Sequence, residues 1–197
     1  MSNKLATNWV LASASKHRRK QLELAGCEVL CQAADIDESP IDGETPKKRA
    51  SRLAMSKALK VRETYPDRLI IGSDQVAHLD NKLLRKPGNH EVALNQLCRS
   101  AGQSVFFETA LAVVFGSHQL TELITTEIEF WPFDRTQADH YLKLEQPYDA
   151  AGSFYSEAMG QWLIKRHQSE DPSAIVGLPM LALNRCLRQL GINPLDQ

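Results

Sequence analysis

Residues 69–76, with the sequence LIIGSDQV, constrain the fold of this chain more than any other segment. Their apolar start is typical of a strand that is buried on both faces, as in a parallel or mixed sheet. Asp74 comes where the apolar run stops, and open α/β sheets bind ligands beyond the carboxyl ends of their strands. A buried carboxylate is costly unless it is paired, hydrogen-bonded or bound to a metal. We therefore predict that this strand ends near Asp74 and that Asp74 takes part in the chemistry.

The charge balance excludes several classes of protein. The 197 residues include 23 Lys and Arg and 24 Asp and Glu, which gives a net charge of −1. Nucleic-acid binders show a basic excess, so we expect no nucleic-acid partner. No segment approaches the roughly 18 apolar residues of a membrane span, and residues 1–8 lack the apolar core of a signal peptide. We expect a cytoplasmic protein without a membrane partner, long enough for one well-buried domain or two small lobes around a cleft.

The cysteines and histidines argue against a metal centre built from these residue types. The four cysteines form neither a C-x-x-C pair nor a zinc spacing, and we interpret them as reduced packing residues: Cys27, Cys31, Cys98 and Cys186. The six histidines show no H-x-x-x-H or H-E-x-x-H arrangement. We therefore expect no catalytic zinc site.

Hydrophobic periodicity and turn residues divide the chain into alternating helices and strands. The expected strands span 9–12, 28–33, 69–76, 104–115, 119–131 and about 161–165. The expected helices span 16–25, 46–65, 90–101, 134–146 and about 180–191. A hairpin is expected through 80–82. Because crossover helices alternate with a central hairpin, we predict an α/β fold with a mixed sheet.

The expected helix 46–65 places a charge on a face that should be apolar. At 3.6 residues per turn, Lys57 lies near the centre of the stripe formed by Ala50, Leu53, Ala54, Ala58 and Val61. One hypothesis is that Lys57 extends along its methylene stem to solvent. The other is that its ammonium points into a cleft that binds an anion.

The start of the first helix has the chemistry of a phosphate site. Arg18 shares a face with apolar residues and lies near free backbone N–H groups at the positive end of the helix dipole. Ser13 and Ser15 either cap this helix or donate hydrogen bonds to phosphate oxygens, and for one of them the cap is the preferred interpretation.

Two further segments supply charges of opposite sign. Glu38 lies in an acidic loop rich in turn residues, and together with Asp74 it can supply carboxylates to a divalent cation that bridges phosphates. Lys86, held before Pro87, is a further candidate for a phosphate contact.

The motifs that contain these residues resemble the Maf family, in the same order along the chain and from about Val10 to Leu195. They are LASAS at 11–15 with the arginines at 18–19, IDE at 36–38, SKA at 56–58, IGSDQV at 71–76, KP at 86–87, AGSF at 151–154 and VGLP at 176–179. The resemblance implies a single domain over 1–197 in which a mixed twisted sheet with flanking helices forms two lobes around a cleft. The fold would be related to that of inosine triphosphate pyrophosphatases, and the protein would be a homodimer.

The resemblance also implies an activity. Maf proteins are nucleoside triphosphate pyrophosphatases that cleave a nucleotide between its α and β phosphates with a divalent metal such as Mg²⁺, Mn²⁺ or Co²⁺. Asp74 matches the catalytic acid that accepts the proton of the attacking water, and Glu38 or Asp74 would hold the metal. The family's other polar cleft positions are matched by Ser13, Arg18, Glu38, Lys57 and Lys86.

The residue after the catalytic acid indicates which nucleobase the substrate carries. Gln75, together with Glu157, resembles the Maf subgroup that acts on 7-methyl-GTP, because subgroups acting on dTTP and UTP have Thr and Gln at these positions. A carboxylate such as Glu157 can accept both N–H donors on the Watson–Crick edge of guanine, and N7-methylation adds a positive charge. The chain departs from the family pattern at Lys16, His17 and Arg85; the subgroup has Trp where His17 would stack on the base.

Two alternatives follow from the same residues. One is a pyrophosphatase for dTTP, UTP or other modified nucleotides. The other is a non-catalytic nucleotide-binding regulator of cell division, which would have no need of a base such as Asp74.

Overall fold

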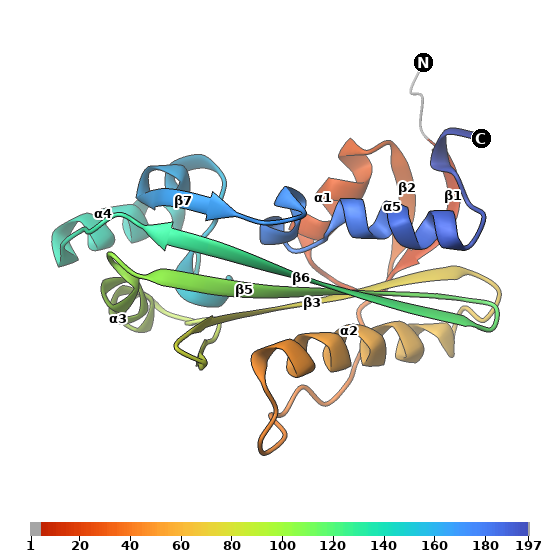
Figure 1. The fold of residues 1–197 in the computed structure, drawn as a ribbon, viewed down its shortest axis with the longest axis horizontal. Helices are drawn as coiled ribbons and strands as arrows, with labels where there is room; N and C mark the ends of the chain where they lie inside the picture. The colour runs from red at the N-terminus through yellow and green to blue at the C-terminus, as the bar shows by residue number, and fades with distance from the viewer. Residues whose placement is uncertain (1–4, 197) are drawn as a thin grey trace.

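A computed structural model describes residues 5–196 and contains a seven-stranded mixed sheet (Figure 1). The strand order is β2-β1-β3-β5-β6-β7, and β4 pairs with β3. The strands are β1 (Leu5–Leu11), β2 (Cys27–Cys31), β3 (Leu69–Leu79), β4 (Lys82–Leu84), β5 (Ser104–Phe115), β6 (His118–Phe130) and β7 (Ile164–Gln168). β1 pairs in parallel with β2 and β3, and all other pairs are antiparallel. The predicted α/β fold with a mixed sheet is confirmed.

Helices cover both faces of this sheet. They are α1 (Lys16–Leu24), α2 (Pro46–Arg62), α3 (His90–Ser100), α4 (Arg135–Glu145) and α5 (Met180–Gln189). In Figure 1, α2 lies below the sheet, α1 and α5 lie above it, and α3 and α4 lie at the far end of the long strands. Short 3₁₀ turns form η1 (Ala151–Ser153), η2 (Ala158–Leu163), η3 (Pro172–Val176) and η4 (Pro194–Asp196). Within residues 5–196 no helix is long and apolar enough to cross a membrane.

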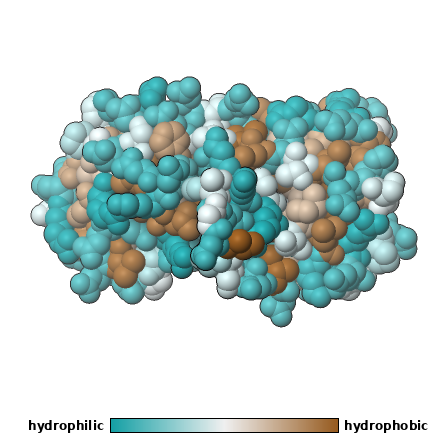
Figure 2. Space-filling model, turned by 60° about the horizontal axis from the view of Figure 1, so that its bottom comes forward, coloured by the Kyte–Doolittle hydropathy of each residue, from teal (hydrophilic) through white to brown (hydrophobic). Residues whose placement is uncertain are grey.

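The apolar core follows from the alternation of side chains along β3. Ile70 belongs to a cluster with α2, and Ile71 belongs to a second cluster with α5 on the opposite face. The far half of the sheet has a third cluster, in which Ala77 and Phe107 pack with residues of α3 and α4. The face of the molecule shown in Figure 2 is mostly hydrophilic, and its apolar residues lie in small separate patches.

The prediction that the strand ends near Asp74 is wrong. β3 continues to Leu79, because β5 pairs with it from Ile70 to His78. On the other edge of β3, however, β1 stops opposite Ile71 and β4 begins only opposite Ala77. Residues 72–76 therefore have a sheet neighbour on one side only, and Asp74 lies beyond the end of the adjacent parallel strand rather than beyond the end of its own.

The end of the chain holds a second correction. The predicted strand at about 161–165 is mostly the 3₁₀ turn η2, and β7 begins only at Ile164. In this turn Gly160 lies so close to the backbone of Tyr155 that a Cβ atom would not fit, and hydrophobic periodicity does not reveal such a contact. The predicted hairpin is confirmed: Asp80 and Asn81 have φ values of 50° and 60°, as a two-residue turn requires. The four cysteines are free.

Candidate active site

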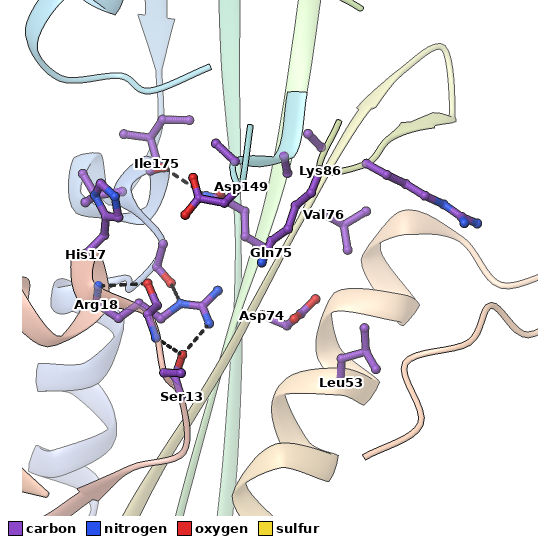
Figure 3. A pocket seen from close by; sticks show the side chains of 18 of the residues that line it. Ser13, His17, Arg18, Leu53, Asp74, Gln75, Val76, Lys86, Asp149 and Ile175 are labelled. Carbon is purple, nitrogen blue, oxygen red and sulfur yellow. Dashed lines mark hydrogen bonds between the residues drawn. The ribbon is translucent and has the colours of Figure 1, made fainter. Parts of the chain in front are cut away.

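A pocket of about 720 Å³ opens at the unpaired edge of β3, between the ends of β1 and β4 (Figure 3). Its walls come from the β1–α1 loop, α2, the loop after β4, residues 149–157 and residues 175–177. Every residue predicted for the site lines it: Ser13, Ser15, His17, Arg18, Glu38, Lys57, Asp74, Gln75, Lys86 and Glu157. Segments far apart in the sequence thus meet at one gap in the sheet.

Lys57 points into this pocket and joins the two predicted carboxylates. Its Nζ lies 2.7 Å from Oδ1 of Asp74 and 2.8 Å from Oε1 of Glu38. The Lys57 and Asp74 side chains are only 12% and 11% exposed. The ammonium therefore points into the cleft rather than to solvent, and binding of an anion there stays a prediction.

Gly72 makes this contact possible by letting α2 lie directly against β3. A Cβ atom at Gly72 would come within 2.2 Å of the carbonyl oxygen of Ala54 and 2.9 Å of Cβ of Ala58. Only glycine allows so close an approach of helix and strand. The helix then places Lys57, one turn beyond Leu53, next to Asp74 on β3.

The electrostatics of Glu38 reflect its cationic surroundings. Burial raises the pKa of this carboxyl, but Lys57, Lys86 and Arg49 together outweigh burial and hold the pKa below its ordinary value. Glu38 is therefore ionised at neutral pH. Arg49 also donates to the backbone carbonyl of Glu38 over 2.5 Å, which fixes the acidic loop to α2. Sequence reasoning missed Arg49, although it lies four and eight residues before Leu53 and Lys57 on the same helical face.

Arg18 and the two serines form the opposite wall. The Nε of Arg18 donates to the carbonyl of Gly177 over 2.8 Å, and its Nη1 donates to Oγ of Ser13 over 3.2 Å. Burial lowers the pKa of the Arg18 guanidinium, while Asp74 and Glu38 act in the opposite direction, and an arginine remains charged under such conditions. Ser15 caps α1, because its Oγ accepts from the N–H of Arg18.

Ser13 keeps a donor for a ligand. Its Oγ accepts from Arg18 and from the backbone N–H of Ser15 over 3.1 Å. A hydroxyl has two acceptor positions and one hydrogen, so the hydrogen of Ser13 is left to donate.

Lys86 is an uncommitted cation of the pocket. Across residues 5–196 it forms no ion pair, yet its charge contributes to the lowered pKa of Glu38. A lysine in this position can contact a phosphate without first breaking an internal bond.

Gln75 faces the other side of the sheet from Asp74. Its Nε2 lies 3.0 Å from the carbonyl oxygens of Ala174 and Ile175 and from Oγ1 of Thr109. The amide N–H groups are thus engaged by η3 and β5, and the amide oxygen is the atom left for a ligand. In the described part of the chain Gln75 has no hydrogen bond to Glu157, so any joint action of the two would pass through a bound nucleotide.

The outer end of the pocket combines rings with carboxylates. The His17 and Tyr155 rings stack with centroids 5.0 Å apart and an interplanar angle of 29°. Nδ1 of His17 lies 3.8 Å from Oε1 of Glu157, and the hydroxyl of Tyr155 donates to Asp149. Sequence reasoning did not select Asp149 or Tyr155; the only signal was an acid and an aromatic residue on either side of the AGSF motif.

The donor set fits a divalent cation only in part. No group of three or more His, Cys, Asp or Glu that could hold a metal exists among the described residues. Glu38 and Asp74 nevertheless share one cation, the Lys57 ammonium. Mg²⁺ is commonly bound by one or two carboxylates together with substrate phosphates, so this pair suits an ion that arrives with a nucleotide.

Comparison with known proteins gives a consistent result. The family model described as "Maf-like protein" matches residues 8–190. A 7-methyl-GTP pyrophosphatase of Bordetella pertussis is 42% identical over 186 residues, which cover 94% of each chain. Proteins of the same name from Xanthomonas axonopodis pv. citri and Nitrosococcus oceani are 44% identical over 182 and 184 residues. These alignments cover 92% of this chain and 96% and 92% of the relatives.

Proposed function

This chain belongs to the Maf family, and we propose that it hydrolyses 7-methyl-GTP between the α and β phosphates to 7-methyl-GMP and pyrophosphate. The observation that supports this most directly is the Asp74–Lys57–Glu38 arrangement, at distances of 2.7 and 2.8 Å, in a pocket whose other end has stacked rings and acids. A triphosphate with a positively charged base matches both ends.

Asp74 is the proposed catalytic base. Lys57 fixes its Oδ1, and Oδ2 has no hydrogen-bond partner among residues 5–196, so Oδ2 can accept the proton of the attacking water. Arg18, Lys57 and Lys86 would stabilise the pyrophosphate leaving group, and Ser13 would donate to a phosphate oxygen. Phosphoryl transfer depends on positioning and charge neutralisation, which these residues supply.

A divalent cation, Mg²⁺, Mn²⁺ or Co²⁺, belongs to the proposal. Glu38 or Asp74 would hold it together with phosphate oxygens. When bound, the ion would neutralise charge on the phosphates. Lys57 would add to the positive charge around the substrate.

We also propose a cytoplasmic location and a homodimer. The four free cysteines suit a reducing compartment. The homodimer rests on the family resemblance.

Release of pyrophosphate and of phosphate from 7-methyl-GTP, GTP, dTTP, UTP, CTP and ITP tests the proposal, with each metal in turn. We expect pyrophosphate as the product and the highest kcat/KM for 7-methyl-GTP. Preference for dTTP or UTP would show that the assigned nucleobase is wrong, while the proposed reaction would be retained. Tight nucleotide binding without any hydrolysis would overturn the reaction and favour the non-catalytic regulator.

A further inference from the structure

Tyr155 is fixed at the outer end of the pocket by contacts on three sides. Its backbone N–H donates to the hydroxyl of Tyr141 over 3.0 Å. Its carbonyl lies against Gly160, where a Cβ atom would come within 1.7 Å of the oxygen. Its ring stacks on His17. A ring so constrained is an ordered platform for a flat ligand and loses little entropy when one binds.

The Tyr155 hydroxyl also orients Asp149. It donates to Oδ1 of that carboxylate. Burial raises the pKa of Tyr155, and the Asp149 hydrogen bond raises it further, so the hydroxyl stays protonated and remains a donor across the working range of pH. Oδ2 of Asp149 has no partner among residues 5–196. Asp149 lines the pocket and, in the view of Figure 3, lies between His17 and Gln75.

The outer end therefore has two carboxylates, Asp149 and Glu157, beside one aromatic platform. A neutral guanine offers one pair of N–H donors on its Watson–Crick edge, and a single carboxylate satisfies them. A second carboxylate adds attraction only if the base itself is positively charged. A base methylated at N7 is both flat and cationic, which is the combination that an aromatic platform with acids favours.

We propose that Asp149, held in place by the Tyr155 hydroxyl, is a specificity-determining residue that selects a cationic, N7-methylated guanine over neutral guanine. The inference rests on the proposed function and deepens it. Tyr155 serves as the stacking platform and as the positioning residue for Asp149.

Two nearly isosteric substitutions test the assignment. Asp149→Asn removes the charge, and Tyr155→Phe keeps the ring while removing the donor. Steady-state kinetics with 7-methyl-GTP and GTP should show that Asp149→Asn lowers the 7-methyl-GTP to GTP ratio of kcat/KM about tenfold, as expected for loss of a charged hydrogen-bond partner. The loss should appear in KM for 7-methyl-GTP, with kcat/KM for GTP unchanged within about twofold. Tyr155→Phe should lower the same ratio by a smaller factor.

Asp67→Asn is the matched control, because it removes the same charge from an exposed position outside the pocket. It should leave the ratio unchanged. An equal loss for both nucleotides in Asp149→Asn, or no loss for either, would overturn the inference.

Calorimetric binding of 7-methyl-GMP and GMP separates this inference from the proposed function, since it needs no turnover. Wild-type protein should prefer 7-methyl-GMP, and Asp149→Asn should lose most of that preference. If no nucleotide is hydrolysed but this change is observed, the reaction is wrong and the specificity role of Asp149 stands. If hydrolysis proceeds and Asp149→Asn binds both nucleotides as the wild type does, the proposed reaction is retained and the specificity role of Asp149 is wrong.

Discussion

The two ends of the pocket are built in different ways. At the phosphate end, which comprises Lys57, Asp74 and Glu38, the Lys57 and Asp74 side chains are nearly buried and project from α2 and β3. Glu38, in a loop, is 53% exposed but is held by the Lys57 ammonium. At the base end, which is the outer end of the pocket described above, the His17 and Glu157 side chains are 42% and 48% exposed. Glu157 belongs to a loop. The 3.8 Å contact between His17 and Glu157 is also looser than the contacts of Lys57.

The difference separates the reaction from the choice of substrate. Groups on packed helices and strands hold their geometry, whereas loops tolerate change. Substitutions at the phosphate end should therefore lower turnover of every nucleotide. Substitutions at the base end should alter KM and preference while leaving the chemistry intact.

Asp74→Asn should have the largest effect. Loss of the proposed base should lower kcat about 10³-fold for 7-methyl-GTP and GTP alike. Single-turnover assays of pyrophosphate release measure this loss, and thermal unfolding checks that the fold is retained. Turnover within tenfold of the wild type would show that another group is the base.

Lys57→Met should lower kcat about 10²-fold for both nucleotides, since it removes a cation that contacts both carboxylates. Because Lys57 helps to hold the pKa of Glu38 below its ordinary 4.5, its loss should raise that pKa. The acidic limb of the kcat/KM profile should move to higher pH. In the wild type, ionised Glu38 stabilises the fold above pH 4.5, and this contribution is lost as the pH falls through the lowered pKa. The variant should keep only the smaller part of this contribution that Lys86 and Arg49 supply.

Gly72→Ala should damage the phosphate end through the backbone. A Cβ atom 2.2 Å from the carbonyl of Ala54 must push α2 away from β3 and separate Lys57 from Asp74. We expect a loss of about 1–3 kcal/mol in the free energy of unfolding and an equal fall in kcat for both nucleotides, about tenfold or more. Gly116→Ala is the control for loss of stability alone: nothing lies within 4 Å of a Cβ there, but its φ of +57° strains any other residue, so this variant should lose stability without a matching fall in kcat. A selective loss of one nucleotide would contradict the separation of the two ends.

Gly160→Ala is the counterpart at the base end. The added methyl group would meet the carbonyl of Tyr155 and displace its ring. KM for 7-methyl-GTP should rise about fivefold, with kcat nearly unchanged. Steady-state kinetics at saturating metal measure both constants. A fall in kcat with an unchanged KM would show that the platform supports the chemistry rather than the binding.

His17→Trp should have the smallest effect, and a favourable one. A larger ring beside Tyr155 should lower KM for 7-methyl-GTP about two- to threefold and leave GTP unchanged. Competition between the two nucleotides in one reaction detects so small a shift. Absence of any gain would count against stacking at this position.

Local patterns were sufficient where one element determines the outcome. The apolar stripe of the second helix singled out Lys57 but left open whether its ammonium points into a cleft or to solvent. The cap chemistry of residues 13–15 placed the start of α1. The identity of Asp74 as a site residue followed from one strand. The predicted end of that strand near Asp74 was wrong, because the end of β3 depends on pairing with β5, which is distant in sequence.

Other features depend on contacts that no local pattern contains. Gln75 is held by η3, which returns to the sheet about a hundred residues later. Asp149 and Tyr155 meet through a loop in which Gly152 and Ser153 have φ values of 74° and 58°. Such backbone conformations are set by packing, since a serine rarely adopts them by itself.

The unpaired stretch of β3 has a consequence for association between molecules. An exposed strand edge is ordinarily a template on which another chain can add a strand. Here residues 72–76 span only about 16 Å, and β1 and β4 close the edge at either end. The pocket thus lies against an unpaired but mostly buried stretch of a central strand, and the flanking strands keep an extended polypeptide from aligning there.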